Sequence, residues 1–103
     1  MLYKILVEEL NSRKSVLPEI NFEIVKETPL YESDSQIGIM LECSSANNKE
    51  GSISLRTTSA GFHLYDLEVF DMGTGENILV KSDSFLLEEQ LAVKIDEFLK
   101  AMT

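Results

Sequence analysis

The N-terminal part of the chain places apolar residues at the spacing of an α-helix. Within residues 2–14 they recur in steps of three and four, which puts them on one stripe of a helix. This stripe consists of Leu2, Ile5, Leu6 and Leu10. A strand over Tyr3–Val7 is the alternative, because that run is short and contains Ile and Val; the spacing favours the helix. Leu17-Pro18 ends the element, since a proline disfavours helical geometry at the residue before it.

The C-terminal part predicts a second helix, over residues 84–101. Asp83 or Ser84 can cap its first turn by accepting a hydrogen bond from a backbone N–H. Glu88 and Glu89 suit the positive end of the helix dipole. The apolar stripe is formed by Leu87, Leu91, Ile95 and Phe98, joined by Leu86, Val93, Leu99 and Met102.

Between the helices the apolar period changes from 3.6 to 2, which is typical of strands with one buried face. The alternation predicts about five strands: Ile20–Val25, Ile37–Cys43, Ser52–Thr57, Phe62–Asp71 and Asn77–Lys81. Pro29 and the polar residues 32–36 separate the first two strands. In the fourth strand the alternation slips after Leu64, and a bulge within residues 64–66 would reconcile its two halves.

The order helix, strands, helix predicts an α+β fold in a single domain, residues 1–103. Short connections favour antiparallel neighbours, because parallel strands need crossovers of a dozen residues or more. We therefore expect one antiparallel sheet of about five strands, with the N- and C-terminal helices packed on one face. The other face is expected to stay partly open.

Charge narrows the function classes. The 103 residues carry 18 acidic and nine basic side chains, a formal net charge of −9. Such a surface repels phosphate backbones and anionic lipid, so direct binding to nucleic acid or membranes is disfavoured. The single cysteine, Cys43, cannot form an internal disulfide, which points to a reducing compartment. The first apolar run is too short for a signal peptide and none suits a membrane span, so we expect a cytoplasmic protein.

Candidate catalytic groups are few. Cys43 alternates in phase with Leu41 and is expected in the core, where burial raises a thiol's pKa and makes it inert. His63, the only histidine, is expected to be structural or on the surface. A Cys43–His63 pair oriented by Asp66 stays open, because catalytic partners meet in space. Asp66 and Glu68 could share a proton if both were buried. We expect no enzyme activity, no metal site and no cofactor.

The strand parity also sorts side chains between the two faces of the sheet. If the apolar positions face the helices, carboxylates and large apolar groups share the opposite face: Glu23, Met40, Glu42, Asp66, Glu68 and Phe70, with Arg56 beside them. An ordinary solvated sheet face is one interpretation. The other is a docking surface for a basic partner, in which Met40 and Phe70 anchor and the carboxylates steer. The loops 32–36 and 44–51 are the alternative interface.

The chain resembles bacterial immunity proteins, which neutralise a toxin delivered by contact-dependent growth inhibition or a related system. The resemblance rests on the charge and on the architecture: the helix 2–14, the strands from Ile20 to Lys81, the stretch Gly61–Phe70 and the closing helix. It implies a cytoplasmic non-enzyme, monomer or homodimer, that covers the basic cleft of a partner toxin, often a nuclease. An escort chaperone that holds an extended secreted effector is the alternative function.

Overall fold

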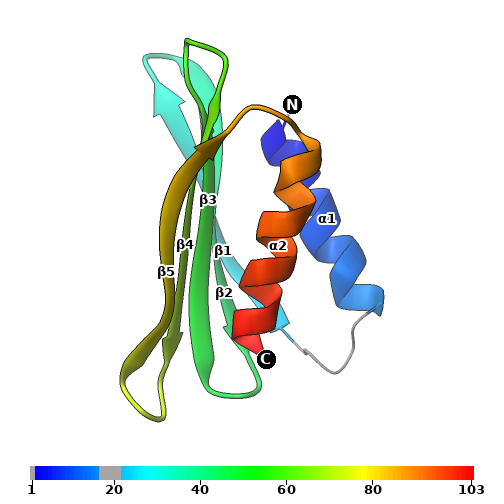
Figure 1. Cartoon of the computed structure of the whole chain (residues 1–103), viewed down its shortest axis with the longest axis vertical. Helices are drawn as coiled ribbons and strands as arrows, with labels where there is room; N and C mark the ends of the chain where they lie inside the picture. Colours follow the sequence, from blue (N-terminus) through cyan, green and yellow to red (C-terminus); the bar gives the residue numbers. More distant parts are fainter. Residues whose placement is uncertain (1, 17–21) are drawn as a thin grey trace.

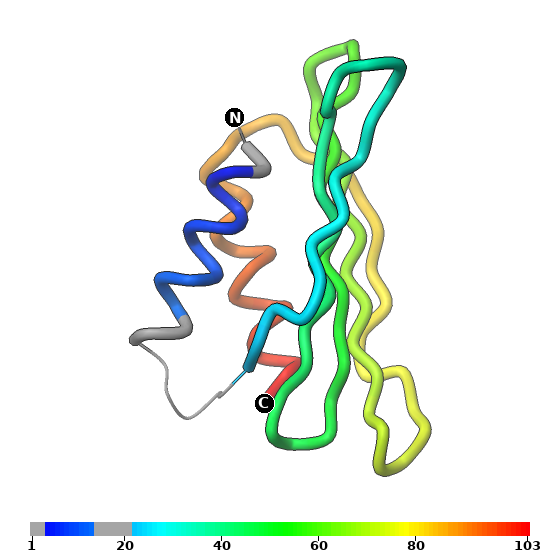
Figure 2. The backbone as a smooth tube through the Cα atoms, turned by 180° about the vertical axis from the view of Figure 1, so that it is seen from behind, coloured from blue at the N-terminus to red at the C-terminus, as the bar shows by residue number. Residues whose placement is uncertain are grey.

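The computed structural model describes the backbone of residues 2–16 and 22–103 and the side chains of residues 4–13 and 22–103. The elements in chain order are α1 (Leu2–Val16), β1 (Phe22–Glu32), β2 (Ser35–Ser45), β3 (Lys49–Thr57), β4 (His63–Asp71), β5 (Glu76–Phe85) and α2 (Glu89–Met102). The strands form one layer, and both helices form a second layer on one side of it (Figure 1). The view from behind shows the same two layers (Figure 2).

The sheet is a meander in which each strand pairs with the next. Its order is β1-β2-β3-β4-β5, and every pair is antiparallel. Tight turns join the strands, and Ser33 and Asn48 adopt positive φ angles of 55° and 58° there. The expected α+β fold, with one antiparallel sheet and helices on one face, is confirmed.

The core lies between the covered face of the sheet and the two helices. The sheet and its end contribute Phe22, Ile39, Leu41, Cys43, Ile53, Leu55, Tyr65, Leu67, Val69 and Phe85 to it. The helices contribute Leu6, Leu10, Leu91, Ile95, Phe98, Leu99 and Met102. Alternation in β2, β3 and β4 therefore identified the buried face correctly.

Two glycines allow close approaches within this arrangement. A Cβ on Gly51 would lie 2.8 Å from Met102 Sδ and 2.8 Å from Phe98 Cε1, so the missing side chain lets the end of α2 lie against the sheet. A Cβ on Gly38 would lie 2.0 Å from the carbonyl oxygen of Leu55, a backbone atom that cannot swing aside. Glycine is therefore required at position 38, whereas at position 51 a side chain would force Met102 and Phe98 to shift.

Ion pairs connect the helical layer. Arg13 of α1 donates to Asp96 of α2 over 3.0 Å and pairs with Glu9 one turn earlier. Burial alone lowers the pKa of Arg13, but its hydrogen bonds to Glu9 and Asp96 outweigh burial and the net shift is upward. Lys81 of β5 pairs with Glu97 of α2 at 3.1 Å. The helices are thus joined to each other and to the sheet edge.

The predicted start of the second helix is wrong. β5 continues to Phe85 and α2 begins only at Glu89, so Asp83 and Ser84 do not cap the helix. The N-cap is Glu88, without a side-chain cap hydrogen bond. Instead the amide oxygen of Gln90 accepts from the backbone N–H groups of residues 86 and 87. This side chain ties the connection before α2 to the first turn of the helix, and it does not cap the N–H groups of that turn.

Part of the predicted helical stripe is also wrong. Leu86 and Leu87 precede α2 and are 71% and 61% exposed, and Val93 is 62% exposed on the helix itself. The remaining members of the stripe from Leu91 onward are buried. The apolar residues keep a helical spacing by chance in the connection between β5 and α2, which is not helical.

Two details of the strands differ from expectation. β1 does not stop at Pro29 but runs through it, because an edge strand leaves one row of N–H groups unpaired and tolerates proline. The bulge expected within residues 64–66 is absent from the continuous β3–β4 register. Leu64 instead lies on the face opposite Tyr65, so the slip in the alternation reflects apolar side chains on both faces of β4.

Some expectations fall outside the described residues. They are the helix end at Leu17-Pro18, the strand start at Ile20 and the side chain of Leu2.

Candidate functional site on the open face of the sheet

The face of the sheet that points away from the helices gathers the predicted docking residues. The cross-strand register gives rows Thr28–Met40–Ser54–Asp66–Ser82, Lys26–Glu42–Ser52–Glu68–Val80, Glu23–Ser44–Glu50–Phe70–Asn77 and Leu30–Gly38–Arg56–Leu64–Ser84. All predicted docking residues, and Arg56, therefore share one face. Their role in binding stays a prediction.

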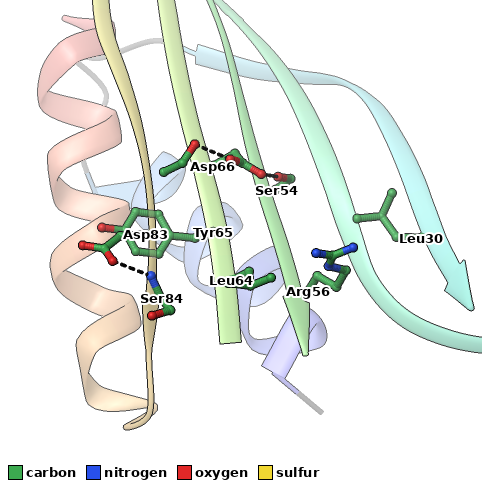
Figure 3. Close-up of a pocket in the computed structure, with 9 residues that line it drawn as sticks. Leu30, Ser54, Arg56, Leu64, Tyr65, Asp66, Asp83 and Ser84 are labelled. Carbon is green, nitrogen blue, oxygen red and sulfur yellow. Dashed lines mark hydrogen bonds between the residues drawn. The ribbon is translucent and has the colours of Figure 1, made fainter. Parts of the chain in front are cut away.

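One hollow on this face surrounds Asp66. It has a volume of about 540 Å³ and is lined by Leu30, Ser54, Arg56, Leu64, Tyr65, Asp66, Ser82, Asp83 and Ser84 (Figure 3). Asp66 Oδ2 accepts from Ser54 Oγ at 3.2 Å, and Asp66 Oδ1 accepts from Ser82 Oγ. Both serines are direct cross-strand neighbours of Asp66. The register thus fixes the orientation of this carboxylate.

A second hollow, of about 370 Å³, lies further along the same strands. It is lined by Val25, Glu42, Cys43, Ser44, Glu50, Gly51, Ser52, Glu68, Phe70 and Asn77. Carboxylates therefore surround an aromatic ring there, as the parity argument expected. Glu23 and Met40 share the face but line neither hollow.

Electrostatics distinguish this face from the helical layer. Among the residues with described side chains, the ion pairs join Arg13, Glu9 and Asp96, and Lys81 and Glu97. None of them involves a carboxylate of the open face. These carboxylates keep their negative charge available to an incoming group.

The alternative catalytic arrangement of Cys43, His63 and Asp66 does not form. Cys43 is on the covered face in the row of Gly51 and Val69. His63 is six positions along β4 from that row, roughly 20 Å at the rise of a strand. Asp66 points to the opposite face. These groups cannot act on one substrate atom.

Each of these groups has a structural environment of its own. Burial raises the pKa of Cys43 to about 12, so the thiol is protonated and unreactive at neutral pH. His63 Nδ1 is 2.9 Å from Thr57 Oγ1, and its ring lies 5.1 Å from that of Phe85. Asp66 and Glu68 are both exposed, so the buried proton-sharing pair considered above does not form.

Two further observations concern metals and membranes. Within the part of the chain that the structure describes, no three His, Cys, Asp or Glu side chains come close enough together to hold a metal ion. In that same part, neither helix has the length and apolar character needed to cross a bilayer.

The fold and this face define a sheet-and-helix protein with one open, acidic side. Comparison with protein-family models, curated proteins and solved structures gives no match to the chain.

Sequence reasoning missed the residues that shape the hollow around Asp66. Ser54 and Ser82 lie on the open-face parity of their strands but carry no charge, so they did not stand out. Leu30 and Leu64 contribute its apolar walls. The strand register, which a single sequence does not provide, is the signal that would have grouped them with Asp66.

Proposed function

We propose that this chain is a binding protein that neutralises a basic protein toxin, a nuclease in the first instance, by covering its cleft with the open face of the sheet. The observation that carries the proposal is the combination, on one face, of large apolar groups such as Met40 and Phe70 with carboxylates that join no ion pair among the described side chains. Interfaces of this kind use apolar anchors for affinity and charges for orientation.

The mechanism needs no bond-making chemistry. A nuclease cleft is positive because it must bind phosphates, and a protein of net charge −9 competes for the same field. Complementary potentials accelerate the encounter toward about 10⁸–10⁹ M⁻¹s⁻¹ at low salt. Fast association matters for an inhibitor, since a free toxin molecule turns over substrate until it is captured. Occupying the cleft then excludes the nucleic acid sterically.

Co-expression with the candidate toxin, the product of the gene next to the one for this chain, tests the proposal. Cells that produce both proteins should survive, and cells that produce the toxin alone should die. In vitro, titrating the purified nuclease with this protein should abolish its activity at an equimolar ratio. A catalytically inactive toxin variant is the matched control for toxicity unrelated to the cleft. Death despite co-expression, with no complex on size exclusion, contradicts the proposal.

An escort chaperone is the second candidate, favoured by one observation. A hollow of about 520 Å³ between the end of β5 and the start of α2 is lined by Phe62, Ser84, Phe85, Leu86, Leu87 and Gln90. The exposed leucines there could hold an extended apolar segment of a client. Light scattering bears on the choice, because an obligate dimer assembled through the helices favours the chaperone, whereas a monomer favours the toxin-binding protein.

A further inference from the structure

The hollow around Asp66 has features of a specific subsite within the open face. We propose that it takes one arginine side chain of the basic partner, from an extended segment that presents a carboxylate to Arg56 two residues further on. The inference rests on the proposed function and names the partner chemistry that the face recognises.

Asp66 is prepared to receive a cation. Ser54 and Ser82 each donate to one of its oxygens, so the carboxylate is oriented before a partner arrives. A group that is already ordered loses less conformational freedom on binding. Each carboxylate oxygen can accept more than one hydrogen bond, so a planar guanidinium can still bind both oxygens at once. Lysine offers only a point charge, which is why arginine is the better occupant.

The walls of the hollow suit the stem of such a side chain. Leu64 and Leu30 supply apolar surface on the Arg56 side of the hollow (Figure 3). Gly38 lies between Leu30 and Arg56 in the register. Arginine packs its methylene groups on apolar surface while its charged head stays at the polar end.

Arg56 supplies the second half of the recognition. It pairs with Leu64 in the β3–β4 register, so it is a diagonal cross-strand neighbour of Asp66. The backbone positions of such neighbours are about 7–8 Å apart. No ion pair joins Arg56 to a carboxylate among the described side chains. Residues i and i+2 of an extended strand point to the same side about 6.6 Å apart. A segment with arginine, any residue and then aspartate therefore matches the spacing and the signs.

The second hollow provides an internal comparison. Glu42, Glu50 and Glu68 line it, but it has no cation in its lining and no hydrogen bond holds those carboxylates in the described part of the chain. It offers negative charge without a fixed orientation. Glu68 is thus the matched control for Asp66: the same strand, the same face and two residues away.

A short peptide tests the subsite without the toxin. The probe is acetyl-Gly-Arg-Ala-Asp-Gly-amide, titrated into ¹⁵N-labelled protein at low salt while amide shifts are followed by NMR. Shifts should concentrate at residues 54, 66 and 82. Replacing the arginine of the peptide by lysine, or its aspartate by alanine, should weaken binding severalfold. Equal shifts around Glu68 and Asp66, or equal affinity for all three peptides, would overturn the inference.

Variants of the protein sharpen the assignment. Asp66→Asn should weaken peptide binding about tenfold, the equivalent of 1.4 kcal/mol, and Glu68→Gln should change it less than twofold. Ser54→Ala with Ser82→Ala keeps the charge but frees the carboxylate, and should reduce the preference for arginine over lysine. An unchanged melting temperature shows that each variant folds. Equal losses for the Asp66 and Glu68 variants contradict a specific subsite.

The same variants distinguish this inference from the proposed function. If the toxin binds Asp66→Asn as tightly as the original chain, the arginine subsite is wrong and the docking face stands. If the peptide binds at Asp66 but no toxin is neutralised, the proposed function is wrong and the subsite stands.

Discussion

The two faces of β4 carry different tasks on alternate residues of one strand. Tyr65, Leu67 and Val69 point toward the helices and are buried, whereas Asp66 and Glu68 point away and are exposed. On the helical side ion pairs hold elements of the fold together, whereas the carboxylates on the open side form no ion pair with any side chain that the structure describes. Stability and recognition can therefore change independently, because a strand separates its side chains by parity.

The largest expected effect tests this division through two leucines of β4. Leu67 is 0% exposed on the covered face, and Leu67→Ala should lower the free energy of unfolding by about 4 kcal/mol, since it removes buried methyl groups and leaves a cavity. Leu64→Ala, on the open face, should lower it by about 1 kcal/mol or less. Urea denaturation followed by circular dichroism measures both. Equal losses of the free energy of unfolding in the two variants would show that Leu64 on the open face contributes as much to stability as Leu67 in the core.

Charge reversal tests the other side of the comparison. Asp66→Lys with Glu68→Lys should weaken toxin binding by about 3 kcal/mol, more than a hundredfold, because buried interfacial charges lose their partners. The free energy of unfolding should change little, as both residues are exposed. Isothermal titration calorimetry gives the affinity.

The matched control is Glu88→Lys with Glu89→Lys, which makes the same change in net charge on the helical layer. It should slow association modestly and leave the dissociation rate unchanged. If both pairs of substitutions weaken binding equally, net charge and not the open face determines affinity.

Cys43 tests how well the covered face is sealed. Burial raises the pKa of this thiol from 9.0 to about 12, so between these pH values the unfolded chain releases a proton that the folded chain retains. Stability should then fall as pH rises, by up to about 1.4 kcal/mol per pH unit from this group. Cys43→Ala lacks this contribution, so its stability should converge on that of the original chain above pH 9. A constant difference between the two would mean that water reaches the thiol.

The covered face could be predicted from the sequence because hydrophobic alternation directly records burial. In β2 and β3 the period of 2 identified Leu41, Ile53 and Leu55 as buried. In β4 the same alternation placed Asp66 and Glu68 on the other face. Alternation assigns a side chain to one face of a sheet whichever strands are neighbours. The open face as a whole was therefore within reach of the sequence.

The hollow around Asp66 could not be predicted from the sequence, because it depends on the strand register and on which strands are neighbours. Ser54, Ser82 and Leu30 come from three different strands, and only pairing brings them to Asp66. The start of α2 was predicted wrongly for a related reason. Leu87 lies four residues before Leu91, so it fits a helical stripe, although the chain at Leu87 is still a connection. The spacing of apolar residues indicates a local preference for helix, but tertiary contacts determine the residue at which the helix begins.

The smallest expected effect concerns the link between the helices. Asp96→Asn removes the ion pair with Arg13 and should lower the free energy of unfolding by about 0.5 kcal/mol, because Asp96 is exposed and solvent weakens the attraction. The loss should shrink in 1 M salt, where the Debye length is about 3 Å. Asp34→Asn, in the turn between β1 and β2, is the control and should have no measurable effect. Toxin affinity should be unchanged in both variants; a weaker complex for Asp96→Asn alone would extend the interface onto the helical layer and end the separation between the two faces.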